Sequence, residues 1–230
     1  MIIQGKKYKI LFIDADDTLY DFRQCEWNAL TATLRENGIE PTEEVIEAYH
    51  LINGKLWKDL EKGLIKQADI KYERYRLLCQ HLGWDNDYMK LSLDYIQRIS
   101  NERILLPGAE EICRYLAGKY MLVLLTNGIS EIQRGRFESS VLFPYFSHMV
   151  ISEEACCSKP DPGIFTWALL DLPVVEKEEM IIIGDSLSSD IQGGINFGID
   201  TCWLNPGLKD AEVLSPTYII RQLSDLKNIL

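Results

Sequence analysis

The sequence predicts an α/β fold in which a doubly wound parallel sheet carries an inserted all-helical segment. Short apolar runs end in polar or glycine-containing turns, and helical segments lie between these runs. A long interval near the N-terminus shows apolar residues only at helical spacing. Repeated alternation of strand and helix is typical of parallel sheets, so we expect a sheet covered by helices on both faces.

Five segments are predicted as buried strands because they are short, apolar and bounded by polar turns. They are residues 8–13, 121–125, 149–151, 180–183 and 201–204. Helices are predicted for residues 109–117, which follow Pro107-Gly108, and for residues 188–197. Ligands of such sheets bind outside the carboxyl ends of the strands, so the polar turns there are candidate site segments.

The interval from residue 19 to residue 105 is predicted to be entirely helical, with Gly83 as a helix stop. We therefore expect a core domain of residues 1–18 and 106–230 and a helical cap domain of residues 19–105. Three aromatic residues of this interval could stack on a substrate ring, although helical spacing favours packing in a core. They are Phe22, Trp27 and Trp57.

Composition narrows the possible partners. The formal net charge of -11 and the lack of a basic cluster argue against a nucleic acid polymer or an anionic membrane as partner. No apolar run is long enough to cross a bilayer, and the N-terminal residues do not resemble a secretion signal, so a cytoplasmic location is expected. Six scattered cysteines without C-x-x-C spacing predict reduced thiols. The oligomeric state is not determined by the sequence.

The strongest chemical signal is an acidic turn at the end of the first predicted strand. Asp14, Asp16 and Asp17 lie within four residues, followed by Thr18. Carboxylates gathered in this way repel one another, and a divalent cation relieves the repulsion. A solvated acidic turn or a helix cap remains the alternative, because short motifs match by chance.

Three further segments follow predicted strands or lie close to one. Asp185 comes directly after an apolar run, with Asp190 about one helical turn later, although Asp185 alone could be a turn residue. The Thr126-Asn127-Gly128 turn could surround a phosphate with hydroxyl and N–H groups, or be a plain turn. Lys159, before Pro160, is a single cation between two apolar segments, although most lysines are exposed at the surface.

Together and in this order, the four segments resemble the signature of the haloacid dehalogenase (HAD) superfamily over essentially the whole chain. The motifs are Asp14-x-Asp16-x-Thr18, Thr126, Lys159-Pro160 and Gly184-Asp185-x-x-x-x-Asp190. The resemblance implies a Rossmann-like core, and the helical insert is similar to the type 1 cap of the family. The opening and second motifs are also similar to those of pyrimidine 5'-nucleotidases.

The resemblance implies hydrolysis of a phosphorylated small molecule through an aspartyl-phosphate. Asp14 would be the nucleophile and Asp16 the general acid and base. Thr126 and Lys159 would complete the catalytic group by binding the oxygens of the phosphate.

The same resemblance implies two groups of binding residues. Asn127 and Gly128 would bind the substrate phosphate. Mg²⁺ would be the cofactor, held by Asp14, the backbone carbonyl of Asp16, Asp185 and Asp190, the last directly or through water.

Other activities remain open from the sequence. A sugar-phosphate phosphatase or a phosphomutase would share the full motif set. A 2-haloacid dehalogenase is disfavoured because that branch typically lacks the second aspartate, here Asp16, and halide departure needs no proton. A non-catalytic binding protein is disfavoured because every motif position holds a residue competent for catalysis.

Overall fold

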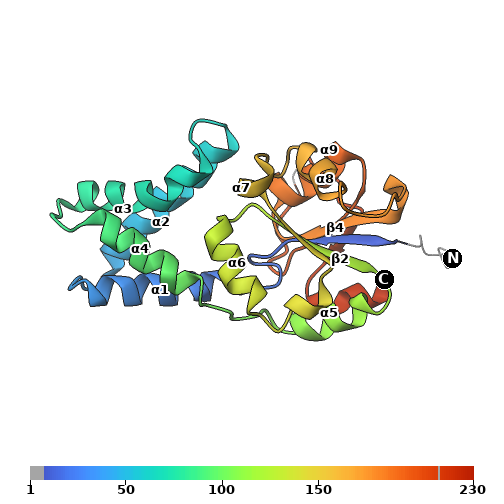
Figure 1. Cartoon of the computed structure of the whole chain (residues 1–230), viewed down its shortest axis with the longest axis horizontal. Coiled ribbons are helices and arrows are strands. Elements are labelled where there is room, and N and C mark those ends of the chain that lie inside the picture. The colour runs from blue at the N-terminus through green and yellow to red at the C-terminus, as the bar shows by residue number, and fades with distance from the viewer. Residues whose placement is uncertain (1–7, 212) are drawn as a thin grey trace. The chain divides into compact units, whose positions relative to one another are not determined.

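The computed structural model describes residues 8–211 and 213–230, which form two compact units (Figure 1). An α/β unit contains residues 8–22, 104–128 and 137–230. A helical unit contains Arg23–Arg103 together with Ile129–Arg136. The sequence prediction placed residues 1–18 and 106–230 in the core domain and residues 19–105 in the cap domain. It therefore differs by a few residues at the two boundaries and assigns residues 129–136 to the core. Residues 1–7, where a secretion signal was considered, lie outside the described residues.

The α/β unit is built on a six-stranded parallel sheet with the strand order β3-β2-β1-β4-β5-β6. This confirms the predicted doubly wound parallel sheet. The strands are β1 (Ile10–Ile13), β2 (Met121–Thr126), β3 (His148–Ile151), β4 (Met180–Gly184), β5 (Asp200–Leu204) and β6 (Tyr218–Ile220). Strand β6 was not predicted, because it has only three residues and its central Ile219 is exposed.

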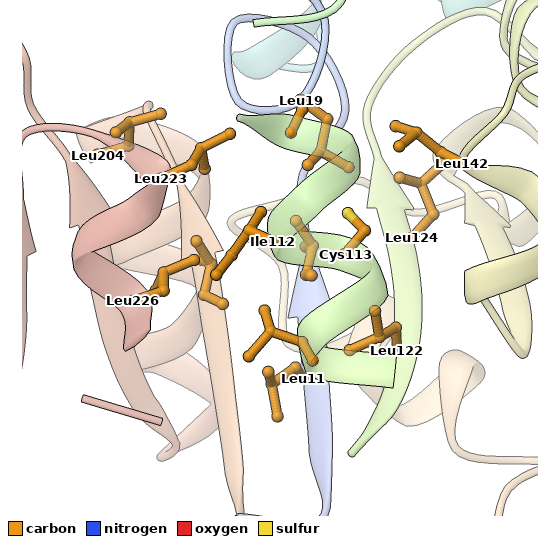
Figure 2. Close-up of a cluster of buried hydrophobic side chains, with 14 of the residues drawn as sticks. Leu11, Leu19, Ile112, Cys113, Leu122, Leu124, Leu142, Leu204, Leu223 and Leu226 are labelled. Carbon is orange, nitrogen blue, oxygen red and sulfur yellow. The ribbon is translucent and has the colours of Figure 1, made fainter. Parts of the chain in front are cut away.

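Helices cover both faces of this sheet because successive strand residues point to opposite sides. Leu11 and Ile13 face α5 (Ala109–Ala117) and η4 (Leu223–Asn228), as Figure 2 shows for part of this cluster. Ile10 and Phe12 face α8 (Gly163–Ala168) and α9 (Gln192–Phe197). Figure 1 shows α5 on one side of the sheet and α8 and α9 on the other. Most of α6 (Ser130–Glu138) belongs to the helical unit. The α/β unit also contains η1 (Phe143–Tyr145), α7 (Ser152–Ala155), η2 (Lys177–Glu179) and η3 (Leu187–Ile191).

Of the two helices predicted outside the helical interval, the one at residues 109–117 agrees with the structure and the one at residues 188–197 does not. Helix α5 has the bounds predicted from the sequence, but residues 188–197 do not form a single α-helix. Residues Leu187–Ile191 form a π-helical turn, in which the Ile191 N–H donates to the carbonyl of Ser186 at 3.1 Å. An α-helix would place that bond four residues apart rather than five. Helix α9 begins only after this wide turn.

The helical unit contains four long helices, where the sequence predicted helical structure without fixing the number of helices. They are α1 (Phe22–Glu36), α2 (Glu43–Glu61), α3 (Gln67–Leu82) and α4 (Tyr88–Ile99). Gly83 ends α3 in the left-handed conformation, which confirms it as the helix stop. The expectation that Trp27 packs in a core is wrong, since 46% of it is exposed. Leu30 and Leu34, three and seven residues further along α1, are buried.

Within residues 8–211 and 213–230, none of the helices combines the length and apolar character needed to cross a membrane.

The close packing of α9 on the sheet gives a test of the fold. A Cβ atom at Gly194 would lie 2.5 Å from Thr201 Cγ2 and 2.6 Å from Ile182 Cγ2. We expect Gly194→Ala to lower the free energy of unfolding by about 1–3 kcal/mol, measured by urea denaturation, because the core must move to accept the methyl group.

A matched control lies in the same unit. Gly118 has φ -72° and its added Cβ would meet only the Tyr115 carbonyl oxygen, at 3.7 Å. Gly118→Ala should be neutral or stabilise by up to about 1 kcal/mol, because alanine adopts this conformation freely. Equal losses in the two variants would contradict the packing described for α9.

Candidate active site

The register of three adjacent strands brings the predicted motifs to one edge of the sheet. Ile13 of β1 lies level with Leu124 of β2 and with Ile183 of β4. The residues that follow therefore emerge side by side at the carboxyl edge, where ligands bind in such sheets. Asp14 is fixed there by its N–H, which donates to the carbonyl of Ile183 at 3.0 Å.

Lys159 is the centre of this group. Its Nζ lies 2.6 Å from Asp14 Oδ1, 2.7 Å from Asp190 Oδ1 and 2.6 Å from the Leu125 carbonyl oxygen. Only 1% of the lysine is exposed. Burial disfavours the charged ammonium, but Asp14 and Asp190 outweigh burial and raise the pKa of Lys159. The lysine is therefore a buried, permanent cation rather than a surface residue.

The first motif folds into a tight turn that presents both ends of the Asp14 carboxylate. Asp14 Oδ1 contacts Lys159, and Oδ2 accepts a hydrogen bond from Thr18 Oγ1 at 3.1 Å. The turn closes because the Leu19 and Tyr20 N–H groups both donate to the Ala15 carbonyl. Asp16 lies within this turn and is partly exposed. Its role in proton transfer stays a prediction.

Asp14, Asp185 and Asp190 form the acidic group that could hold a metal ion. One carboxylate oxygen of each lies within 4.8 Å of the others. Burial, with Asp190 and Asp17 adding repulsion, raises the pKa of Asp185 to about 7. Burial also raises the pKa of Asp14, against the opposing effect of Lys159. Three hard oxygen donors with excess negative charge suit a divalent cation such as Mg²⁺.

The fourth motif owes its shape to residues that pack against its aspartates. A Cβ at Gly184 would lie 2.2 Å from Asp190 Oδ2, so only glycine leaves room for this carboxylate. The Ser186 N–H donates to the same oxygen at 3.0 Å. Trp203 Nε1 donates to the Asp185 carbonyl at 2.8 Å. Sequence reasoning did not single out Trp203, because it lies on another strand and no local pattern links it to Asp185.

The second motif contributes in a way that the sequence did not indicate. Thr126 is buried, and its Oγ1 accepts a hydrogen bond from the Gly128 N–H at 3.0 Å. The Asn127 amide bonds the backbone of Lys159, where Nδ2 donates to the carbonyl at 2.8 Å and Oδ1 accepts from the N–H at 2.9 Å. The Asn127 side chain is thus engaged by the third motif. Substrate binding by Asn127 and Gly128 stays a prediction.

A doubly wound parallel sheet with carboxylates from two strand ends around a buried lysine defines a Rossmann-like α/β protein with an acidic centre suited to a divalent cation. The family model of haloacid dehalogenase-like hydrolases matches residues 8–198. The chain therefore belongs to the haloacid dehalogenase-like hydrolases, which confirms the resemblance drawn from its motifs.

Relatives match nearly the full length of the chain. The pyrimidine 5'-nucleotidase PynA of Streptococcus pneumoniae is 38% identical, over 97% of each chain. The pyrimidine 5'-nucleotidase YjjG of Escherichia coli is 31% identical, over 97% of this chain and 98% of that one. The HAD-hydrolase YfnB of Bacillus subtilis is 34% identical over 98% of this chain and 96% of its own. A crystal structure of YfnB bound to magnesium superposes with a TM-score of 0.91, covering 98% and 99% of the two chains.

The raised pKa of Asp185 predicts how stability depends on pH in the metal-free protein. This pKa is about 7 in the folded state and about 3.9 in an unfolded chain. Between these values the folded state binds more protons, so the free energy of unfolding should fall as pH rises from about 4 to about 7. Asp185→Asn should flatten this slope in thermal unfolding.

Added Mg²⁺ supplies a second measurement on the same group. Protons compete with the cation for carboxylates, so Mg²⁺ should raise the unfolding temperature more at about pH 8 than at about pH 5.5. A shift of the same size at both pH values would contradict a site formed by these aspartates.

Proposed function

We propose that the chain is a magnesium-dependent phosphomonoesterase that acts through an aspartyl-phosphate on Asp14. The contact of one buried ammonium with both Asp14 and Asp190 carries this proposal. Such an arrangement orients a carboxylate nucleophile and places a permanent positive charge where phosphate oxygens would gather. Membership of a hydrolase family and full-length similarity to two nucleotidases support it.

In the first step, an oxygen of Asp14 attacks phosphorus in line, a P–O bond to the aspartate forms and the ester P–O bond breaks. Asp16 protonates the departing alkoxide, so no strongly basic product is released. In the second step, Asp16 takes a proton from water, which attacks the aspartyl-phosphate and frees Asp14 and inorganic phosphate. Two easier displacements thereby replace one difficult hydrolysis.

The charge of the transferring phosphoryl group is balanced by residues of the second and third motifs. Thr126 and the Asn127 N–H bind its oxygens, the Gly128 N–H orients the Thr126 hydroxyl, and the ammonium of Lys159 supplies positive charge beside them. Lys159 does so while it holds Asp14, from which its Nζ is 2.6 Å away.

Mg²⁺ fits the donor set of the site. Asp14, Asp185 and Asp190, with the Asp16 carbonyl, would hold the ion, and the similarity to magnesium-bound YfnB supports this choice. When bound, the ion lowers the repulsion between an anionic nucleophile and an anionic phosphate.

Pyrimidine nucleoside 5'-monophosphates are the substrate class that we propose. PynA and YjjG, both pyrimidine 5'-nucleotidases, cover almost the whole chain at 38% and 31% identity. We further propose that residues 19–105 act as a cap that selects the substrate, while residues 1–18 and 106–230 carry the chemistry. Chemistry and selection would then reside in different segments of the chain.

Substitution of the two motif aspartates tests the chemistry. Asp14→Asn should abolish p-nitrophenyl phosphate hydrolysis, and Asp16→Asn should lower kcat by about 10²–10⁴-fold, because general acid catalysis is worth that much. EDTA should silence the wild-type enzyme, and Mg²⁺ should restore it. Asp171→Asn changes an exposed aspartate of the same unit and is the control for folding and handling. Full activity of Asp14→Asn would overturn the nucleophile assignment.

A panel of phosphorylated metabolites tests the substrate class. We expect kcat/KM for UMP, dUMP and TMP to exceed the values for purine nucleotides and sugar phosphates. Each kcat/KM ratio reports differential binding of the transition state. A clear preference for a sugar phosphate would point to a sugar-phosphate phosphatase, and dependence on a bisphosphate activator would point to a phosphomutase.

A further inference from the structure

The position of Lys159 depends on one strand end that holds it at both extremities. At the tip of its side chain, Nζ donates to the Leu125 carbonyl at the end of β2. At its backbone, the amide of Asn127, two residues further along, bonds both the N–H and the carbonyl of Lys159 at 2.9 and 2.8 Å. The end of β2 and the residue that follows it therefore hold both the backbone and the side-chain ammonium of Lys159.

Anchoring the backbone matters because a lysine reaches its partners through a long, flexible chain. Nζ must meet Asp14 and Asp190 at 2.6 and 2.7 Å simultaneously. A shift of the Lys159 backbone would break one of these contacts or force the side chain from a favourable rotamer. Two hydrogen bonds from one planar amide restrict both displacement and rotation of the Lys159 segment, as a neighbouring strand would.

We propose that Asn127 is a positioning residue, whose side-chain amide fixes Lys159 in register with Asp14 and Asp190. Asn127 thereby contributes to phosphoryl transfer through Lys159, beyond any contact of its own N–H with substrate. This inference rests on the proposed phosphomonoesterase function. Asn196 adds support from α9, where its Nδ2 donates to the Pro160 carbonyl at 3.0 Å.

The chain contains a matched control for this interaction. Asn205 bonds the backbone of Lys209 in the same two-way manner, with Nδ2 to the carbonyl and Oδ1 from the N–H, both at 2.9 Å. Asn205 is buried and Asn127 is partly buried, and Asn205 joins the end of β5 to the loop before β6, in a part of the chain outside the candidate site. Asn127→Ala and Asn205→Ala therefore remove the same pair of bonds in two different places.

The test compares these two variants with the wild-type protein. Both should lower the unfolding temperature, because both lose a partly buried pair of hydrogen bonds. Only Asn127→Ala should lower kcat for p-nitrophenyl phosphate, by about 10–100-fold and by more than it changes KM, because misplacing a catalytic group by about 1 Å costs up to about 10²-fold. Asn205→Ala should keep the wild-type kcat.

A binding measurement gives the same information without turnover. Calorimetric titration with inorganic phosphate in the presence of Mg²⁺ should show about tenfold weaker binding to Asn127→Ala, which misplaces a charged hydrogen-bond donor, and unchanged binding to Asn205→Ala. If Asn127→Ala does not fold, Asn127→Asp replaces it, because this variant keeps the size of the side chain and the acceptor but loses the donor.

Two failures can be distinguished. A wild-type protein that hydrolyses no phosphomonoester would overturn the proposed function, and phosphate binding would then decide the positioning role alone. Folded Asn127 variants with kcat and phosphate binding equal to those of Asn205→Ala would overturn the positioning role and leave the hydrolase intact.

Discussion

The buried ammonium of Lys159 is the interaction on which the site depends. A fully buried charge is costly unless charged and hydrogen-bonding partners surround it. Lys159 finds two carboxylates and one carbonyl, all within 2.7 Å. The partners lie directly after β1, in β2 and in η3, so the lysine joins three separate segments at one point. Loss of the lysine would leave Asp14 and Asp190 without their shared cation, which is costly for buried carboxylates.

The charges around Lys159 do not balance, and the imbalance has a chemical use. Asp185 joins Asp14 and Asp190, so three carboxylates face one lysine. The resulting repulsion contributes to the raised pKa of Asp185 and favours a divalent cation at the same point. A centre that is unfavourable without a cation is therefore suited to bind one, and then to accept an anionic phosphate.

Much of the fold and the site follows from local sequence patterns. Five strands, helix α5 and the stop at Gly83 lie where period and turn residues predict them. Strand β6 and the π-helical turn η3 were missed because three residues carry too weak a pattern, and because a wide turn leaves no periodic signature. Trp27 was misjudged because helical spacing alone does not say which residues of a periodic set are covered: Leu30 and Leu34 are buried, whereas Trp27 is exposed.

The sequence by itself determined the alternation of strands and helices along the chain, because this depends on short-range patterns. It also determined the family and the residue types able to carry the chemistry, because these depend on motifs at fixed spacing. Only the tertiary structure decided how those residues meet. Strand register and packing between distant segments bury Lys159, bring the Asn127 amide to its backbone and bring Trp203 Nε1 to the Asp185 carbonyl. Contacts between residues that are far apart in the sequence leave no local pattern, so they can be identified only from the three-dimensional structure.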